Sequence, residues 1–444
     1  MAQPPALADR IIHARWIAPV EGSQRLLDRH ALVIKDGRIA DLLPSAQAES
    51  HWQAPEVSHL DSHLLIPGLI NAHTHAAMNL FRGLADDLPL MTWLEEHIWP
   101  AEGRWVSEEF VSDGTRLACA EMIRSGTTCF ADMYFFPDAI GRAATEAGLR
   151  ACLFSPILDS PTPMGQGPDD YLRIATQCID DWRHEPLIQI GFGPHAPYTV
   201  SDEPLQRLLT LAEELDAPIM MHVHETAGEV SMASEANGER PLARLARLGL
   251  LSPRLLAVHM TQLSEDEIRL VAETGTQVVH CPESNLKLAS GFCPVEALRQ
   301  AGINVALGTD GAASNNDLDM FGEMRTAALL AKGVAGRADA LPADAALAMA
   351  TLNGARALGL EQHIGSLAVG KQADITAVDL AELESQPLYD PIAQLVYAAG
   401  RHQVSHVWVS GKALLAERKL TTRNRERLLR DAASWRDKIA GETP

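Results

Sequence analysis

Positive charge is scarce in this chain. Its 444 residues include 37 Lys and Arg against 58 Asp and Glu, which gives a formal net charge of −21. Nucleic acids and anionic membranes attract basic surfaces, so this charge argues against both as partners. No uncharged apolar run approaches the roughly 20 residues of a membrane span, and Met1 to Arg10 lacks a basic-then-apolar signal pattern. These absences predict a cytoplasmic protein without a membrane or nucleic-acid partner.

Cysteine is also sparse, with six residues scattered along the chain and no Cys-x-x-Cys pair. Five of the six lie in or beside apolar segments, where a cysteine behaves as a small buried hydrophobe. We therefore expect reduced, buried thiols rather than a disulfide framework. The cysteines are Cys119, Cys129, Cys152, Cys178, Cys281 and Cys293.

Between Leu64 and Gly311 the chain alternates β-like apolar runs with helical patterns such as Glu203–Leu215 and the capping-box segment that Ser264 opens. Eight βα units predict a closed parallel (β/α)8 TIM-type barrel. An open doubly wound sheet is the alternative, but it rarely contains eight equivalent units. The eight runs are Leu64–His75, Gly126–Tyr134, Ala151–Leu158, Ile188–His195, Pro218–Glu225, Leu255–His259, Thr276–Cys281 and Asn304–Asp310.

The two flanks are rich in strand patterns. Ala31–Ala40 predicts a hairpin with its turn at Asp36-Gly37, and the region from Ile364 repeats this style. We expect a small β-sandwich domain built from both termini, residues 1–66 with 364–444, around a barrel of residues 67–363. Further helical patterns lie at Ala343–Leu358 and Arg423–Ile439.

Polar residues recur where the predicted strands end. Barrel active sites are built at the carboxyl ends of the strands, and repeated polar residues at that position are hard to explain by packing. This pattern predicts that the active site lies at that face. The residues are His75, His195, His222, Glu225, His259, His280 and Asp310.

Four of the strand-end side chains have the character of metal ligands. His73 and His75 are separated by two positions, so they point to the same side of a strand and can bind one ion. His222 can add a third nitrogen and Asp310 an oxygen. Three nitrogens and one carboxylate suit zinc or a similar divalent ion with room for a water, which is a hydrolytic centre.

The segment Asn79–Ser107 is a long insertion after the first predicted strand, rich in Leu, Met and Trp. Loops of this length in compact folds are often lids or binding loops, although a contact in a homo-oligomer explains the tryptophans almost equally well. Apolar residues here and nearby could wall a slot for a substrate, or they could simply be core. They are Met78, Leu80, Phe81, Met91, Trp93 and Met133.

Several strings resemble the amidohydrolase superfamily, metal-dependent hydrolases built on a (β/α)8 barrel. PGLINAHTH (Pro67–His75) is similar to its first-strand signature, and HVHET (His222–Thr226) and GTDG (Gly308–Gly311) are similar to its fifth and eighth. VVHCPESNLKL (Val278–Leu288) resembles the branch that contains deaminases and triazine chlorohydrolases. The resemblance covers nearly the whole chain.

Within that branch, three strings resemble the 5′-methylthioadenosine/S-adenosylhomocysteine deaminases. They are HTHAAMNLFRGLADDLPLMTWL (His73–Leu94), PAEGRW around Glu102, and GFGPHAPYTVS (Gly191–Ser201). The resemblance implies metal ligands at His73, His75, His222 and Asp310, and catalytic roles for Glu225 and His259. It implies that Glu102 and His195 bind the substrate, a small-molecule nucleoside.

The number of ions can be argued from a missing residue. Two-metal hydrolases of this type often bridge their ions with a carboxylated lysine, but no lysine occurs between Lys35 and Lys287. We therefore expect one divalent ion, zinc first and iron or manganese as alternatives, with a bridging Glu or Cys as a weaker option. The ion would lower the pKa of its water from about 16 toward about 7, and the resulting hydroxide would attack C6 of an adenine ring.

The acid–base roles follow from position. Glu225 could protonate the ring nitrogen and collect the ammonia, as a zinc deaminase requires. A solvated helix-start carboxylate is the alternative, but the HxxE pairing of His222 and Glu225 is typical of hydrolytic metal sites and favours catalysis. His259 could orient or deprotonate the water, although a lone strand-end histidine is often a satisfied core residue. Asp310 could bind the metal and accept the proton of the water, or serve only as a turn residue. Both carboxylates, Glu225 and Asp310, would also contact the substrate.

One departure from the family concerns the substrate. Family members hold the amino-acid carboxylate of S-adenosylhomocysteine with arginines after the third strand, whereas Asp159–Gly167 has none and Arg173 is the nearest candidate. A small apolar thioether is therefore better supported than a charged tail. Guanine or cytosine deaminase, an s-triazine chlorohydrolase and a non-enzymatic assembly protein remain alternatives.

Overall fold

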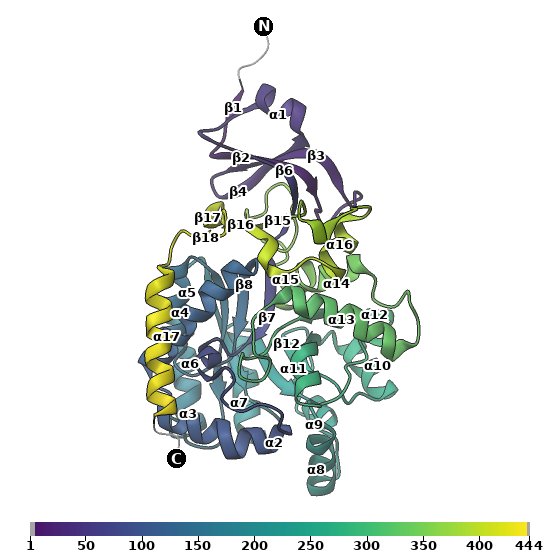
Figure 1. Ribbon diagram of the computed structural model, residues 1–444. Helices are drawn as coiled ribbons and strands as arrows, with labels where there is room; N and C mark the ends of the chain where they lie inside the picture. The colour runs from purple at the N-terminus through teal and green to yellow at the C-terminus, as the bar shows by residue number, and fades with distance from the viewer. Residues whose placement is uncertain (1–4, 442–444) are drawn as a thin grey trace.

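A sheet of eight parallel strands forms the centre of the molecule, and the computed structural model describes residues 5–441 (Figure 1). All residues of β7, β8, β9, β11 and β12 are buried, as expected for parallel strands covered on both faces. Each of the eight predicted runs provides one strand of this sheet, so the predicted barrel is confirmed. The strands are β7 (Leu69–Thr74), β8 (Thr127–Asp132), β9 (Arg150–Ile157), β10 (Ile188–Pro194), β11 (Ile219–Val223), β12 (Leu255–His259), β13 (Gln277–His280) and β14 (Val305–Leu307).

The first predicted run is divided between two sheets. Its residues up to Pro67 end β6 (Glu56–Pro67) of the second sheet, and the barrel strand β7 begins at Leu69. The break is at Gly68, where a Cβ atom would lie only 2.0 Å from Thr128 Oγ1. Thr128 belongs to the neighbouring strand β8, and only glycine permits the chain to pass this close to it.

The barrel closes where its last strand meets its first. The backbone N–H of Asp310 donates to the carbonyl of His73 at 3.0 Å. The Asn71 side chain spans the same seam, accepting from Thr309 N at 2.9 Å and donating to Thr309 Oγ1 at 2.7 Å. This closure brings the residues that follow β14 next to the histidines of β7.

Helices alternate with the barrel strands. The pattern at Glu203–Leu215 is the helix α7, and Ser264 and Glu267 form the expected capping box. The pattern at Ala343–Leu358 is two helices instead of one, because the Ala350 carbonyl between them accepts from Ile70 N of β7 at 2.8 Å. The helices of this part are α4 (Glu108–Arg124), α5 (Pro137–Ala147), α6 (Pro168–Trp182), α7 (Asp202–Glu214), α8 (Ala227–Asn237), α9 (Pro241–Arg247), α10 (Glu265–Thr274), α11 (Pro282–Lys287), α12 (Val295–Gln300), α13 (Met320–Ala335), α14 (Ala343–Met349) and α15 (Leu352–Ala357).

Both ends of the chain build a second sheet of eight strands above the barrel (Figure 1). The expected hairpin is present, with Asp36 and Gly37 at φ of 51° and 72° in its turn. The strand order in this sheet is β18-β17-β16-β15-β6-β2-β3-β4. The same two terminal segments of the chain also contain the helices α1 (Ser45–His51) and α16 (Pro391–Tyr397). The remaining bounds are β2 (Arg10–Ile17), β3 (Leu27–Lys35), β4 (Arg38–Pro44), β15 (Ile375–Asp379), β16 (Val404–Val409), β17 (Lys412–Ala416) and β18 (Lys419–Leu420), with β1 (Ala6–Leu7) and β5 (Trp52–Gln53) paired separately.

The last helix, α17 (Arg425–Ala440), runs along the barrel rather than the second sheet (Figure 1). Trp435 on this helix donates to Asp113 Oδ2 of α4 at 3.0 Å and packs edge-on against Phe110, with ring centroids 5.2 Å apart.

The proposed domain limits, residues 1–66 with 364–444 and residues 67–363, stay a prediction. No helix within residues 5–441 has both the length and the apolar character needed to cross a membrane.

The insertion after β7 folds into short helical pieces at the end of the barrel opposite the second sheet (Figure 1). They are η1 (Ala76–Phe81), α2 (Leu90–Thr92), the π-helical turn η2 (Trp93–Ile98) and α3 (Trp99–Trp105). The ion pair between Lys287 Nζ and Asp86 Oδ1, 2.6 Å long, ties this segment to α11. The insertion therefore lies over the carboxyl ends of the barrel strands.

Candidate active site

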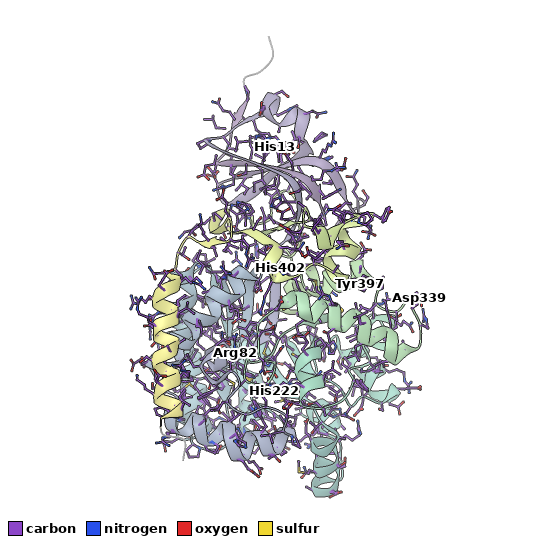
Figure 2. The ribbon with its side chains drawn as sticks, viewed as in Figure 1. His13, Arg82, His222, Asp339, Tyr397 and His402 are labelled. Atoms are coloured by element: carbon purple, nitrogen blue, oxygen red, sulfur yellow. The ribbon has the colours of Figure 1, made fainter. Side chains whose placement is uncertain are left out.

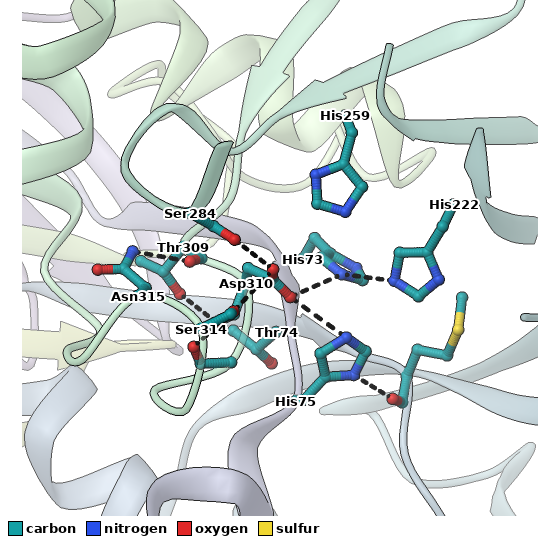
Figure 3. A network of polar contacts seen from close by, with 12 residues as sticks. His73, Thr74, His75, His222, His259, Ser284, Thr309, Asp310, Ser314 and Asn315 are labelled. Carbon is teal, nitrogen blue, oxygen red and sulfur yellow. Dashed lines mark hydrogen bonds and ion pairs between the residues drawn. The ribbon is translucent and has the colours of Figure 1, made fainter. Parts of the chain in front are cut away.

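The four predicted metal ligands converge at the carboxyl ends of β7, β11 and β14 (Figure 3). Asp310 Oδ1 lies 3.5 Å from His73 Nε2 and 3.2 Å from His75 Nε2. His222 Nε2 lies 3.2 Å from His73 Nε2. His222 is in the barrel, far from the second sheet that carries His13 (Figure 2). The three nitrogens and one oxygen thus face a common centre.

The outer atoms of these side chains are held by other partners. His75 Nδ1 donates to the Met133 carbonyl at 2.6 Å, and His222 Nδ1 donates to the His195 carbonyl at 2.8 Å. A proton on Nδ1 leaves the lone pair on Nε2, which is the arrangement found in metal-ligating histidines. The donor set and its outer partners therefore fit a divalent metal ion.

The carboxylate of Asp310 is oriented in the same way. Its Oδ2 accepts hydrogen bonds from Ser284 Oγ at 2.6 Å and Ser314 Oγ at 2.9 Å, so Oδ1 faces the imidazoles (Figure 3). Burial alone would raise the pKa of Asp310, but hydrogen bonds with His73 and His75 hold it well below its usual range. Asp310 is therefore available as a charged ligand.

His259 and Glu225 lie beside this centre. His259 Nε2 is close enough to His73 and His222 to join them around an ion, and it lies 3.7 Å from Glu225 Oε2. Its Nδ1 faces Asn285 Oδ1 at 2.8 Å. Burial raises the pKa of Glu225. A carboxyl group that retains its proton more readily than usual can serve as a general acid.

His224 turns away from the centre even though it is two positions after His222. Its φ of 52° is in the left-handed region and ends the alternation of the strand. The ring contacts the Gln262 carbonyl through Nδ1 and accepts from Leu242 N through Nε2 at 3.1 Å. His224 is therefore a buried structural histidine.

A cavity of about 380 Å³ opens above the centre. Of the predicted apolar wall, Met78, Trp93 and Met133 line this cavity, whereas Leu80, Phe81 and Met91 pack elsewhere. The insertion supplies much of the lining, as expected of a binding loop. The insertion residues that line it are Leu90, Trp93, Leu94, Ile98, Trp99, Glu102 and Gly103.

Glu102 and His195, the two predicted substrate-binding residues, also line this cavity. Glu102 Oε1 accepts a hydrogen bond from the Tyr134 hydroxyl at 2.7 Å, and burial raises the pKa of Glu102 to about 7. His195 Nδ1 contacts Thr199 Oγ1 at 3.0 Å, and burial lowers the pKa of His195 to about 4. His195 is therefore a neutral imidazole near pH 7.

Two further sequence candidates do not reach the cavity. His280 is buried outside the lining, and Arg173 is exposed and paired with Asp170 at 3.5 Å. Conversely, three side chains of the site were not expected from the sequence, namely Tyr134, Ser284 and Ser314. Ser284 lies in the quoted segment after the seventh strand, and Tyr134 ends the second predicted run, so position alone could have drawn attention to both.

The amidohydrolase family matches residues 64–414, and the chain belongs to that family. It is a metal-dependent hydrolase. The chain is 56% identical, over 435 residues and 98% of each sequence, to a 5-methylthioadenosine/S-adenosylhomocysteine deaminase from Saccharophagus degradans. A second deaminase of this name, from Teredinibacter turnerae, is 52% identical over 98% of each sequence.

The fold of the whole chain also matches solved structures. An adenosine deaminase from Xanthomonas campestris with bound zinc superimposes with a TM-score of 0.98 at 52% identity, covering 99% of this chain and 100% of that one. An atrazine chlorohydrolase from Arthrobacter aurescens, complexed with zinc, gives a TM-score of 0.90 at 22% identity over 96% of this chain and 99% of that one. This second likeness shows the fold alone.

Proposed function

We propose that this hydrolase deaminates adenosine thioethers, with water replacing the amino group at purine C6 and ammonia leaving. The observation that carries the proposal is the convergence of four candidate ligand atoms beneath a cavity that Glu102 and His195 also line. The names of the full-length relatives support the same substrate class.

The cofactor we propose is one divalent metal ion held by His73, His75, His222 and Asp310. When bound, the ion would act as a Lewis acid that makes water a stronger nucleophile near neutral pH. The absence of lysine between Lys35 and Lys287 supports a single ion. Zinc suits this ligand set best, and iron or manganese would also be accepted.

The proton transfers belong to the carboxylates and to His259. Asp310 receives one proton from the attacking water, while Glu225 protonates N1 of the ring. Glu225 then takes the remaining proton from the new C6 hydroxyl, which becomes a carbonyl, and delivers it to the amino group that leaves as ammonia. The proton held by Asp310 returns to Glu225 and restores the starting state. His259 Nε2 lies 3.7 Å from Glu225 Oε2 and orients the attacking water between the two carboxylates. The raised pKa of Glu225 supports its role as the acid, since a carboxyl group of ordinary pKa would be almost fully ionised near pH 7.

Glu102 and His195 would hold the sugar and the purine. We propose that Glu102 accepts hydrogen bonds from the ribose hydroxyls, and that His195 contacts a ribose hydroxyl or purine N3. Leu90, Trp93 and Leu158 line the cavity, and within the described residues no lysine or arginine does. A methylthio group therefore fits better than a charged amino-acid tail, because a buried charge needs a partner.

A substrate panel tests this function. Metal-replete protein is incubated with 5′-methylthioadenosine, adenosine, guanine, cytosine and a chlorotriazine, and release of ammonia or chloride is measured. We expect ammonia from the adenosines above all. Chloride release, or turnover of guanine or cytosine alone, would contradict the proposal.

A cytoplasmic location and a homo-oligomer stay predictions.

A further inference from the structure

Helix α8 begins directly after the strand end that carries Glu225, and its third residue, Glu229, reaches back toward that strand end. Thr226 caps the helix by accepting from Glu229 N at 3.2 Å. In an ordinary capping box the glutamate would return to the N–H of the capping residue. Here Glu229 Oε2 accepts from Glu225 N at 2.8 Å, and Oε1 accepts from His224 N at 3.3 Å.

The left-handed conformation of His224, with φ of 52°, accounts for this geometry. Successive residues in left-handed and ordinary conformations direct their N–H groups to the same side and form a concave site for an anion. The carboxylate of Glu229 occupies that site from within the chain. The turn after β11 and the first turn of α8 are thus joined by one side chain.

Glu229 is only 6% exposed. Burial raises its pKa to about 7, and the two backbone hydrogen bonds oppose that rise. Within the described residues, no lysine or arginine forms an ion pair with it. A buried carboxyl group without a cation is destabilising unless its hydrogen bonds are satisfied, so its place here points to a role in holding its neighbours.

The main chain of Glu225 is held at both its polar atoms. Its N–H is bound by Glu229, and its carbonyl accepts from Thr261 Oγ1 at 2.7 Å. Only the side-chain torsions of Glu225 are then left to place its carboxylate, which lines the cavity beside His259.

We propose that Glu229 is a positioning residue that fixes the main chain of Glu225 and, through it, the carboxylate over the substrate ring. The inference rests on the proposed function, because it requires Glu225 to transfer the proton. Misplacing a reacting group by about 1 Å can slow a reaction about 100-fold. The loss should therefore fall on kcat rather than on substrate binding.

The test compares Glu229→Gln with Glu235→Gln, an exposed glutamate on the same helix, in the metal-replete full-length protein. The amide of Gln keeps the size of the side chain but accepts through one oxygen only, so one of the two N–H groups loses its partner. We expect Glu229→Gln to lower kcat about 10- to 100-fold, with KM within about threefold and unchanged metal content. Glu235→Gln should match the wild type.

A double-mutant cycle separates positioning from general damage to the fold. Once Glu225→Gln has removed the acid, adding Glu229→Gln should lower kcat by no more than about threefold, because the two residues act as a unit. Losses that multiply in full would overturn the inference, as would an unchanged kcat in Glu229→Gln. Should Glu229→Gln not fold, Glu229→Asp, one methylene shorter, is compared in the same cycle.

The same experiment distinguishes the two proposals. A wild-type protein that releases no ammonia from any nucleoside overturns both of them. An active wild type in which Glu229→Gln has no effect overturns only the positioning role.

Discussion

A single substitution at the mouth of the cavity tests what the site selects. Ser160 lines this cavity and its side chain is exposed, and no lysine or arginine within the described residues shares that lining. We predict that Ser160→Arg raises kcat/KM for S-adenosylhomocysteine by supplying a cation for the carboxylate of its amino-acid tail. The folded core should tolerate the change because the position is exposed.

The size of the effect follows from the exposure. A hydrogen bond to a charged group is worth about 1.5–3 kcal/mol when shielded, whereas exposed ion pairs are worth about 0.2–1 kcal/mol. An arginine at the mouth of a cavity lies between these cases, at about 1–1.5 kcal/mol, which corresponds to a rise of about 5- to 13-fold in kcat/KM. The change from Ser160 to Gln supplies similar bulk without charge and should give no such rise.

The assay follows the absorbance change on deamination for three nucleosides. In the wild type, kcat/KM for 5′-methylthioadenosine should exceed that for adenosine by about 5- to 30-fold. The reason is that burying the sulfur and the methyl group of the methylthio substituent contributes about 1–2 kcal/mol. Ser160→Arg should leave this ratio unchanged. A wild type that turns over S-adenosylhomocysteine as well as methylthioadenosine, or a variant with no gain, would refute the reasoning.

Four further outcomes are expected. Glu225→Gln should retain the metal, measured by plasma mass spectrometry, yet lose about 10²–10⁴-fold in kcat, and full activity would remove Glu225 from the mechanism. Glu102→Ala should impair nucleosides far more than free adenine, and an equal loss on both would show that Glu102 does not touch the sugar. Because the pKa of Glu102 is raised to about 7, protonation below that pH removes an acceptor for the ribose, so KM should rise as the pH falls, and Glu102→Gln should flatten this profile. Ser284→Ala should weaken metal retention about 10-fold in a chelator titration, because it frees Asp310 Oδ2 from one of its two donors, and unchanged retention would argue against this orienting role.

The barrel could be predicted because its signals are local. Each barrel strand lies in an apolar run, most of these runs end in a polar residue, and the spacing of His73 and His75 already defines a shared face. The convergence of the ligands could be expected from topology alone, because all parallel strands of a barrel end at one face. The atoms that we propose as metal ligands then follow from the residue types.

What sequence patterns missed depends on contacts that are distant along the chain. The hydrogen bonds of Ser284 to Asp310 and of Tyr134 to Glu102 leave no periodic signal, because each joins separate βα units. Ser314 is only four residues from Asp310, but both lie in a loop after β14 that has no periodic pattern. The break between α14 and α15 likewise depends on Ile70, which is far away in sequence. Such contacts are decided by packing of the closed barrel rather than by local propensity.

Anomalous diffraction from crystals of the metal-replete protein tests the central claim most directly. Data collected at the zinc, iron and manganese edges should show one peak per chain, about 2.0–2.2 Å from Nε2 of His73, His75 and His222 and from Oδ1 of Asp310. Two peaks bridged by other residues, or no peak in fully active crystals, would contradict the claim that a single ion at these four ligands carries the hydrolysis.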